Sequence, residues 1–179
     1  MDFYLDTGTI YGRIDHNDKV LNPICVAFFR KFPLKLNNFV TTKYIIEEEL
    51  NNVRFKRTLG LPKTGREIER RARLIMQMIN DVEYSQQNVF KPLSSEIESF
   101  LFNTPENAEK KSPKDHDARL LANAYLWEKN GSNLQTPHFV TTDGIDINNN
   151  KHQIQAIAEK HLAQKTGLFI AYVKALLNN

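Results

Sequence analysis

The sequence has almost no cysteine, and this limits both its chemistry and its compartment. Cys25 is the single cysteine among 179 residues. No internal disulfide can therefore form, which fits a reducing compartment. No second thiol is present to complete a redox or metal motif, so we expect Cys25 to pack inside an apolar helix.

Long apolar runs are also missing. The run from Leu168 to Val173 has six residues and none is longer, whereas a membrane span needs about 18–20. The first residues, Met-Asp-Phe-Tyr-Leu-Asp, lack the basic and apolar regions of a secretory signal. We therefore expect a soluble cytoplasmic protein with no membrane partner.

Several catalytic signatures are absent. The five histidines show no zinc-like spacing. Neither a glycine-rich phosphate loop nor a Gly-x-Ser-x-Gly motif occurs, which argues against a P-loop enzyme and a serine hydrolase. Hydrophobic residues make up 41% and charged residues 25% of the chain. These fractions are typical of a globular domain and exclude a disordered or fibrous chain.

Charge is nearly balanced overall but not locally. The net charge of +3 is too small to indicate a nucleic-acid binder. Residues 51–75, however, hold two acidic and eight basic residues, namely Arg54, Lys56, Arg57, Lys63, Arg66, Arg70, Arg71 and Arg73. Such a segment suits contact with an RNA backbone, but it also suits a solvated helix face, and the sequence leaves both open.

The pattern of apolar residues predicts strands that alternate with helices. We expect strands at 3–5, 39–42 and 139–142, with a loop directly after the first, and helices at 20–32, 44–50, 66–80, 95–102, 112–129 and 151–165. In the helix at 66–80, the expected apolar side is Ile68, Leu74, Ile75, Met78 and Ile79. Residues 168–177 suit a closing strand or a buried helix equally. The alternation predicts an α/β domain with a mainly parallel sheet.

Acidic residues stand where such a sheet places its ligand site. Asp6 and Asp143 each follow a predicted strand, and parallel sheets bind ligands at the carboxyl ends of their strands. The group Glu47 to Glu49 and Asp117 lie on predicted helices. Taken singly, each acid has an ordinary explanation as a turn residue, a solvated helix face or a first-turn acid.

Helix capping helps to choose between neighbouring acids. Ser112 suits the N-cap, Pro113 the first helical position and Asp115 a capping box. This leaves Asp117, as the fifth helical residue, to face the cleft. Asp146 is either a further ligand or a loop acid.

Three threonines lie close to these acids in the sequence. Thr7, Thr9 and Thr142 either orient the carboxylates or make ordinary turn hydrogen bonds.

Four short motifs together resemble the PIN-domain family of metal-dependent ribonucleases. Tyr4-Leu5-Asp6-Thr7-Gly8 is similar to the opening strand with its first aspartate. Val40-Thr41-Thr42-Lys43-Tyr44-Ile45-Ile46-Glu47-Glu48 is similar to the second strand and the helix that carries a glutamate. Asp117-Ala118-Arg119-Leu120-Leu121-Ala122-Asn123-Ala124 and Phe139-Val140-Thr141-Thr142-Asp143 resemble the third and fourth acidic motifs.

This resemblance implies a PIN-like three-layer α/β/α domain over 1–179, with a basic helical insertion at about 51–111. It implies a ribonuclease that hydrolyses RNA phosphodiester bonds with Mg²⁺ or Mn²⁺ held by Asp6, Glu48, Asp117 and Asp143. The motif alignment favours Glu48 over Glu47. A toxin of the VapC type, with a protein antitoxin and a homodimeric assembly, is a further implication.

Two other functions stay open, a DNA flap nuclease and an inactive PIN-like RNA-binding or scaffold module. The complete acidic quartet argues against the inactive module, since degenerate members lose one or more of the acids.

The chemistry of the four acids supports a metal site independently. Mg²⁺ and Mn²⁺ prefer oxygen ligands, and carboxylates supply them. Bound divalent ions activate water and stabilise the leaving oxygen of a phosphodiester. Without a cation, converging carboxylates repel and raise each other's pKa.

Overall fold

A parallel sheet forms the centre of the protein. The computed structural model describes residues 1–51, 65–104, 114–131 and 133–178. Within them, five strands pair in the order β3-β2-β1-β4-β5, all in parallel. The strands are β1 (Asp2–Leu5), β2 (Asn38–Thr41), β3 (Asn80–Asp81), β4 (His138–Thr141) and β5 (Phe169–Tyr172). The predicted α/β class with a parallel sheet is confirmed.

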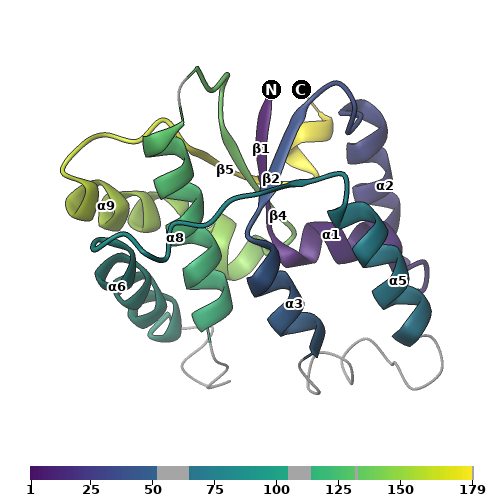
Figure 1. The fold of residues 1–179 in the computed structure, drawn as a ribbon, viewed down its shortest axis with the longest axis horizontal. Helices are drawn as coiled ribbons and strands as arrows, with labels where there is room; N and C mark the ends of the chain where they lie inside the picture. Colours follow the sequence, from purple (N-terminus) through teal and green to yellow (C-terminus); the bar gives the residue numbers. More distant parts are fainter. Residues whose placement is uncertain (52–64, 105–113, 132, 179) are drawn as a thin grey trace.

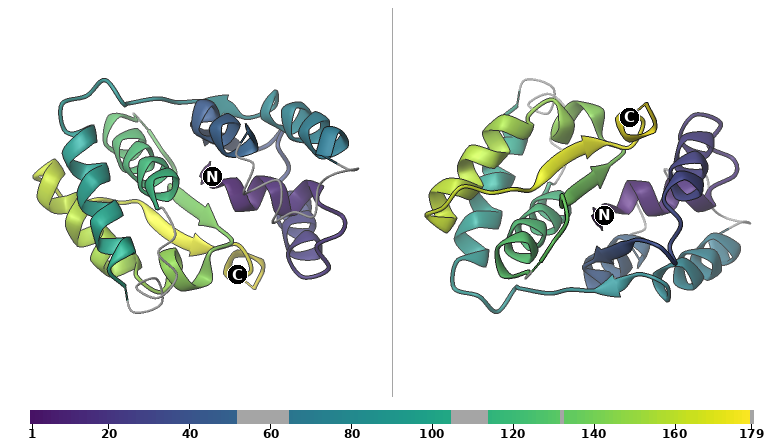
Figure 2. Two further views of the ribbon diagram at one scale, coloured as in Figure 1. Left: turned by 90° about the horizontal axis from the view of Figure 1, so that it is seen from below. Right: turned by 90° about the horizontal axis from the view of Figure 1, so that it is seen from above.

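Helices lie on both sides of this sheet. They are α1 (Thr7–Ile14), α2 (Leu21–Lys31), α3 (Lys43–Asn51), α5 (Gly65–Met76), α6 (Phe90–Phe102), α8 (Asp115–Asn130) and α9 (Lys151–Leu162), with the short η1 (Gly144–Asn148) and η2 (Ala175–Leu177). Figures 1 and 2 show α6, α8 and α9 on one side of the sheet and α1, α2 and α5 on the other. This arrangement is compatible with a three-layer α/β/α fold. No helix of the described ranges has the length and apolar character that a membrane crossing requires.

The core is built around β1. Phe3, Tyr4 and Leu5 are fully buried, as expected for a central strand that is covered on both faces. The Phe3 ring stacks on Phe39 of β2, with 5.1 Å between ring centroids. Cys25 of α2 is also fully buried, so its predicted place in the core is confirmed.

The predicted loop after β1 is wrong, because α1 begins there at once. Asp6 is the N-cap residue, and its Oδ1 accepts a hydrogen bond of 2.6 Å from the Thr9 amide. Ile10 and Ile14, four residues apart, are both buried on the face that this spacing puts together. An aspartate cap therefore starts a helix that the Thr-Gly-Thr composition obscured.

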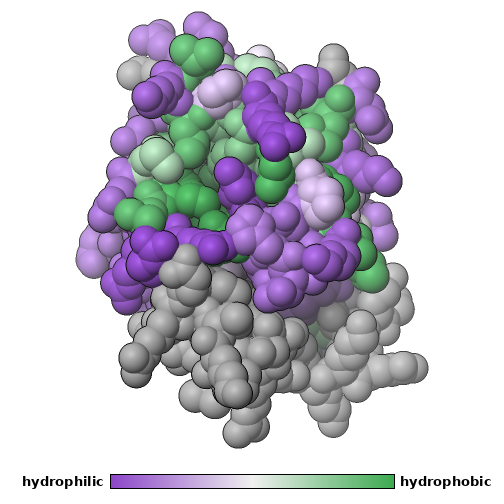
Figure 3. All heavy atoms as spheres, turned by 90° about the vertical axis from the view of Figure 1, so that its right-hand side faces the viewer, coloured by the Kyte–Doolittle hydropathy of each residue, from purple (hydrophilic) through white to green (hydrophobic). Residues whose placement is uncertain are grey.

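The predicted apolar side of the basic helix is also partly wrong. The helix α5 ends at Met76, and Leu74 and Met78 are 46% and 55% exposed. Ala72 and Met76 are the buried pair, and their spacing of four residues puts Leu74 on the other face. The side chain of Ile68 lies outside the described part. Figure 3 shows the α2 and α5 side of the molecule, where apolar patches lie among polar side chains.

The described part of the segment 51–111 contains a strand as well as helices. Its strand β3 pairs with β2, with Val40 opposite Asn80, and its helix α6 packs on α8. Residues 52–64 and 105–111 of this segment lie outside the described ranges. The ambiguous segment 168–177 contains β5 followed by the 3₁₀ turn η2.

The acidic helix starts later than predicted. The helix α8 begins at Asp115 with Lys114 as N-cap, so Asp117 is its third residue instead of its fifth. The predicted cap residues Ser112 and Pro113 lie outside the described ranges. Lys114 makes no side-chain cap, but its carbonyl accepts a hydrogen bond of 2.9 Å from the Ala118 amide and so starts the helical ladder.

Candidate active site

The candidate site lies where the strand order of the sheet reverses. The chain leaves β1 towards β2 on one side, while β4 pairs with β1 on the other side. Open parallel sheets bind ligands at such a point, outside the carboxyl ends of the strands. Asp6 follows β1 here, and Asp143 follows β4.

Asp6 is held rigidly at this point. Its side chain accepts hydrogen bonds from the Thr9 amide (2.6 Å), the Thr141 hydroxyl (2.5 Å) and the Thr142 amide (3.3 Å). The residue is only 6% exposed. Burial raises the pKa of the Asp6 carboxyl even though these three donors lower it, so a nearby cation would stabilise its charged form.

Threonines orient Asp6, but Thr9 and Thr142 do so through backbone amides instead of their side chains. Thr9 and Thr142 donate to Asp6 through their amides, while their hydroxyls donate to the carbonyls of Val140 and Val82. Sequence reasoning missed Thr141. Its hydroxyl donates to Asp6 and accepts a hydrogen bond of 2.9 Å from the Asp143 amide.

Asp117 faces the same site from the start of α8. Burial, Glu49 and the charges of Asp143 and Asp6 raise its pKa to about 8, although Lys114 lowers it. About a third of the side chain still reaches solvent. Burial and the neighbouring carboxylates thus both favour the protonated form of Asp117.

Glu49, not Glu48, joins these aspartates. Burial raises the pKa of Glu49, with Asp6 among the like charges that add to this, while the Thr7 hydroxyl lowers it. Oε2 of Glu49 and the Thr7 hydroxyl are both buried, yet neither has a partner with hydrogen-bond geometry. Glu49 therefore brings an unsatisfied carboxylate oxygen to the cluster.

Glu48 lies outside the cluster on an exposed face of α3. Its carboxylate pairs with Arg119 of α8 at 2.7 Å and lies 3.6 Å from His116. The hydrogen bond from Arg119 lowers the pKa of Glu48. Glu47 is exposed and lines a small cavity beside Arg73 instead.

Helical spacing was the signal that could have separated these glutamates. Ile45 and Ile46 are fully buried, and Glu49 follows them by four and three residues. It therefore shares their face of α3, whereas Glu48 follows the half-buried Tyr44 by four residues. A motif alignment ignores this difference.

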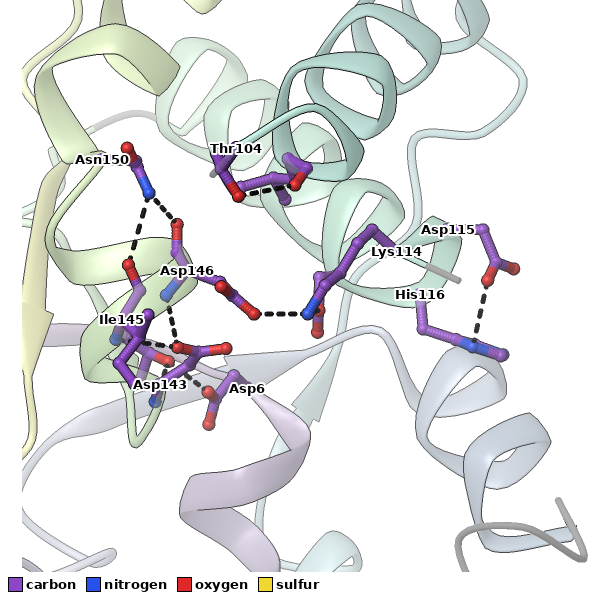
Figure 4. A network of polar contacts seen from close by, with 12 residues as sticks. Asp6, Thr104, Lys114, Asp115, His116, Asp143, Ile145, Asp146 and Asn150 are labelled. Atoms are coloured by element: carbon purple, nitrogen blue, oxygen red, sulfur yellow. Dashed lines mark hydrogen bonds and ion pairs between the residues drawn. The ribbon is translucent and has the colours of Figure 1, made fainter. Parts of the chain in front are cut away.

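Asp143 and Asp146 begin the short helix η1. Oδ1 of Asp143 accepts hydrogen bonds from the amides of Ile145 (3.0 Å) and Asp146 (2.7 Å). Asp146 in turn accepts a hydrogen bond from the Lys114 ammonium (Figure 4). Asp115 points elsewhere, towards His116 at 3.5 Å and Arg119 at 3.9 Å.

Whether these residues suit a divalent cation depends on the chemistry of the donors. Among the described residues, no three acidic, histidine or cysteine side chains are already close enough together to hold one ion. Oxygen donors nevertheless predominate, and Glu49 offers a buried oxygen without a partner. Hard ions prefer such ligands, so Asp6, Glu49, Asp117 and Asp143 fit Mg²⁺ or Mn²⁺ by type of donor.

Comparisons of this chain with protein-family models, with curated proteins and with solved structures found no match.

Proposed function

We propose that the protein is a metal-dependent ribonuclease that hydrolyses RNA phosphodiester bonds and that has a PIN-like fold. The observation that carries this proposal is that burial raises the pKa values of Asp6, Glu49 and Asp117 beside Asp143, and that the charges of Glu49, Asp143 and Asp6 raise the pKa of Asp117 further. Grouped carboxylates that destabilise one another are stabilised by a cation. The four motifs resemble those of PIN-domain ribonucleases, and this resemblance is the reason for proposing RNA as the substrate class.

In this proposal, Asp6, Glu49, Asp117 and Asp143 hold Mg²⁺ or Mn²⁺, with Glu49 in the place that the motifs predicted for Glu48. Such an ion supplies an activated water and stabilises charge on the leaving oxygen. Thr141 positions the site, since its hydroxyl links Asp6 to the Asp143 amide. The amides of Thr9 and Thr142 hold Asp6 from two further sides.

A cleavage assay tests this function. Labelled single-stranded RNA and a DNA flap are incubated with the chain, with and without Mn²⁺, beside an Asp6→Asn variant. We expect RNA to be cut only with Mn²⁺ and only by the wild-type chain. Excess EDTA should stop the reaction.

Each other result has a definite meaning. Cleavage of the flap alone indicates a DNA flap nuclease, and RNA binding without cleavage indicates an inactive RNA-binding module. Undiminished cleavage in EDTA by protein free of contaminating nuclease contradicts the metal mechanism. A VapC-type role, an antitoxin partner and a homodimer stay predictions.

A further inference from the structure

One basic side chain lies inside the acidic site. The side chain of Lys114, at the start of α8, is only 10% exposed, and its ammonium donates a hydrogen bond to Asp146, whose side chain is 13% exposed. Oδ2 of Asp117 lies 3.9 Å from the same nitrogen. Figure 4 shows Lys114 reaching from α8 across to Asp146, with Asp143 and Asp6 beyond it.

Carboxylates lie on two sides of this ammonium. Asp146 accepts its hydrogen bond, and Oδ2 of Asp117 lies 3.9 Å from its nitrogen. A nearly buried charge persists only where opposite charges and hydrogen bonds compensate its lost hydration. Lys114 therefore already neutralises part of this acidic site.

The positive charge of Lys114 does not reach all the carboxylates of the site equally. Asp146 and Asp117 have Lys114 beside them, whereas Glu49 keeps a buried oxygen without a partner next to the unpartnered hydroxyl of Thr7, which is 6% exposed. Among the described carboxylates of the site, the buried oxygen without a partner is thus on Glu49.

Nucleases with two metal ions hold them about 3.5–4 Å apart between shared carboxylates. Here a fixed positive charge stands on one side of the carboxylates, because the Lys114 ammonium contacts Asp146 and lies 3.9 Å from Oδ2 of Asp117. We propose that Lys114 takes the place of a second divalent cation, so that the site binds one Mg²⁺ or Mn²⁺ ion among Asp6, Glu49, Asp117 and Asp143. This inference rests on the proposed metal-dependent function.

The number of bound ions tests it without using activity. The full chain is titrated with Mn²⁺ by calorimetry, and the electron paramagnetic resonance spectrum of the complex is recorded. We expect one ion per chain and the six-line spectrum of an isolated Mn²⁺. Two ions about 4 Å apart would instead couple magnetically.

The Lys114→Met variant keeps an unbranched side chain that is one atom shorter, and it removes the charge. We expect it to bind two Mn²⁺ ions with a coupled spectrum, and its first ion about tenfold more tightly than in the wild type, because one repelling charge is gone. The matched control is Lys91→Met, which makes the same change at an exposed position of α6. It should bind one ion, like the wild type.

Two results would overturn this inference alone. The first is a wild-type chain that binds two ions. This measurement needs no variant, so it tests the inference even if Lys114→Met fails to fold. The second is a folded Lys114→Met chain with one ion at unchanged affinity. RNA cleavage measured in parallel separates the two proposals. Cleavage with two bound ions leaves the ribonuclease intact, whereas a wild-type chain that binds no Mn²⁺ overturns both.

Discussion

Glu48 and Glu49 are adjacent in the chain but have different surroundings. Glu48 pairs with Arg119 on an exposed face, and Glu49 lies half-buried near Asp117, Asp6 and Thr7. A single helical step of about 100° separates them. At the residue scale, this step decides which carboxylate lies on the side of the aspartates.

Exchange of each glutamate for glutamine tests this assignment. Glu49→Gln should lower Mn²⁺-dependent RNA cleavage by about 100-fold or more, since loss of groups that merely support metal ligands already costs about 10–100-fold. Glu48→Gln is the matched control and should keep most activity. It loses an exposed ion pair, which costs at most about 1 kcal/mol of unfolding free energy. Equal losses of activity would contradict the assignment of Glu49.

His138 makes stability depend on pH at a place separate from the site. It is 9% exposed, its ring lies between those of Phe3 and Phe169, and its Nδ1 shares a 2.6 Å hydrogen bond with the Thr136 carbonyl. Burial lowers the pKa of His138, the hydrogen bond with Thr136 opposes this, and the terminal ammonium adds to it. The folded chain therefore prefers the neutral ring.

This preference predicts a loss of stability in acid. Above the unfolded pKa of about 6.5 the ring is neutral in both states, and below it the unfolded chain binds a proton first. The stabilisation is thus lost as the pH falls from about 6.5 through the lowered folded pKa. Thermal unfolding between pH 7 and 5 should show a smaller loss for His138→Asn than for the wild type. The control is His152→Asn, at an exposed position, which should lose as much stability as the wild type. A loss of the same size in His138→Asn would contradict this explanation.

At the scale of elements, α1 approaches the end of β4 very closely. A Cβ atom on Gly8 would lie 2.1 Å from Oγ1 of Thr142. That hydroxyl cannot move freely, because it bonds to the Tyr4 hydroxyl at 2.6 Å and to the Val82 carbonyl at 2.7 Å. The absence of a side chain at Gly8 therefore lets the helix capped by Asp6 reach the site.

We expect Gly8→Ala to lower the unfolding free energy by about 1–3 kcal/mol, the usual cost of overpacking. It should also reduce cleavage, because Thr142 must shift while its amide holds Asp6. Gly144→Ala is the control, since its nearest atom would be 3.8 Å away, and it should change stability by no more than about 0.5 kcal/mol. Urea unfolding measures the unfolding free energies of the two variants. Equal stability of the two variants would show that α1 can move away at little cost.

At the scale of the whole molecule, the basic residues are candidates for the RNA path. Arg70 and Arg73 of α5 are exposed, and Arg73 lines a cavity of about 270 Å³ with Lys43, Glu47, Met76 and Gln77. This cavity joins α5 to α3, the helix that carries Glu49. A strand that follows α5 would thus lead towards the carboxylates.

Arg70→Gln and Arg73→Gln together should weaken RNA binding across sequences. The salt slope of binding should shrink by up to about 0.7 for each phosphate of a single strand that these arginines no longer neutralise. Binding is measured in an Asp6→Asn background at several salt concentrations. The control changes Lys91 and Lys160, on α6 and α9, to Gln. If both pairs have the same effect, only net charge matters and α5 is not the path.

Local patterns were enough to predict much of the sheet and part of the site. The apolar runs of β1, β2 and β4 predicted their strands to within one residue at each end, because fully buried parallel strands are continuous apolar runs. Asp6 and Asp143 followed from the same pattern, since the carboxyl ends of parallel strands share one edge. The two-residue strand β3 has no such pattern, and its pairing with β2 alone makes it a strand.

Only the tertiary structure decided which polar groups meet at that edge. Glu49, Thr141 and the pair of Lys114 with Asp146 come from different elements, and no short motif joins them. Their contacts depend on the face that each helix turns to the sheet and on the packing of α8 beside α3. Packing places these groups because burial of apolar side chains dominates folding, and the polar groups then pair with whatever that packing brings within reach.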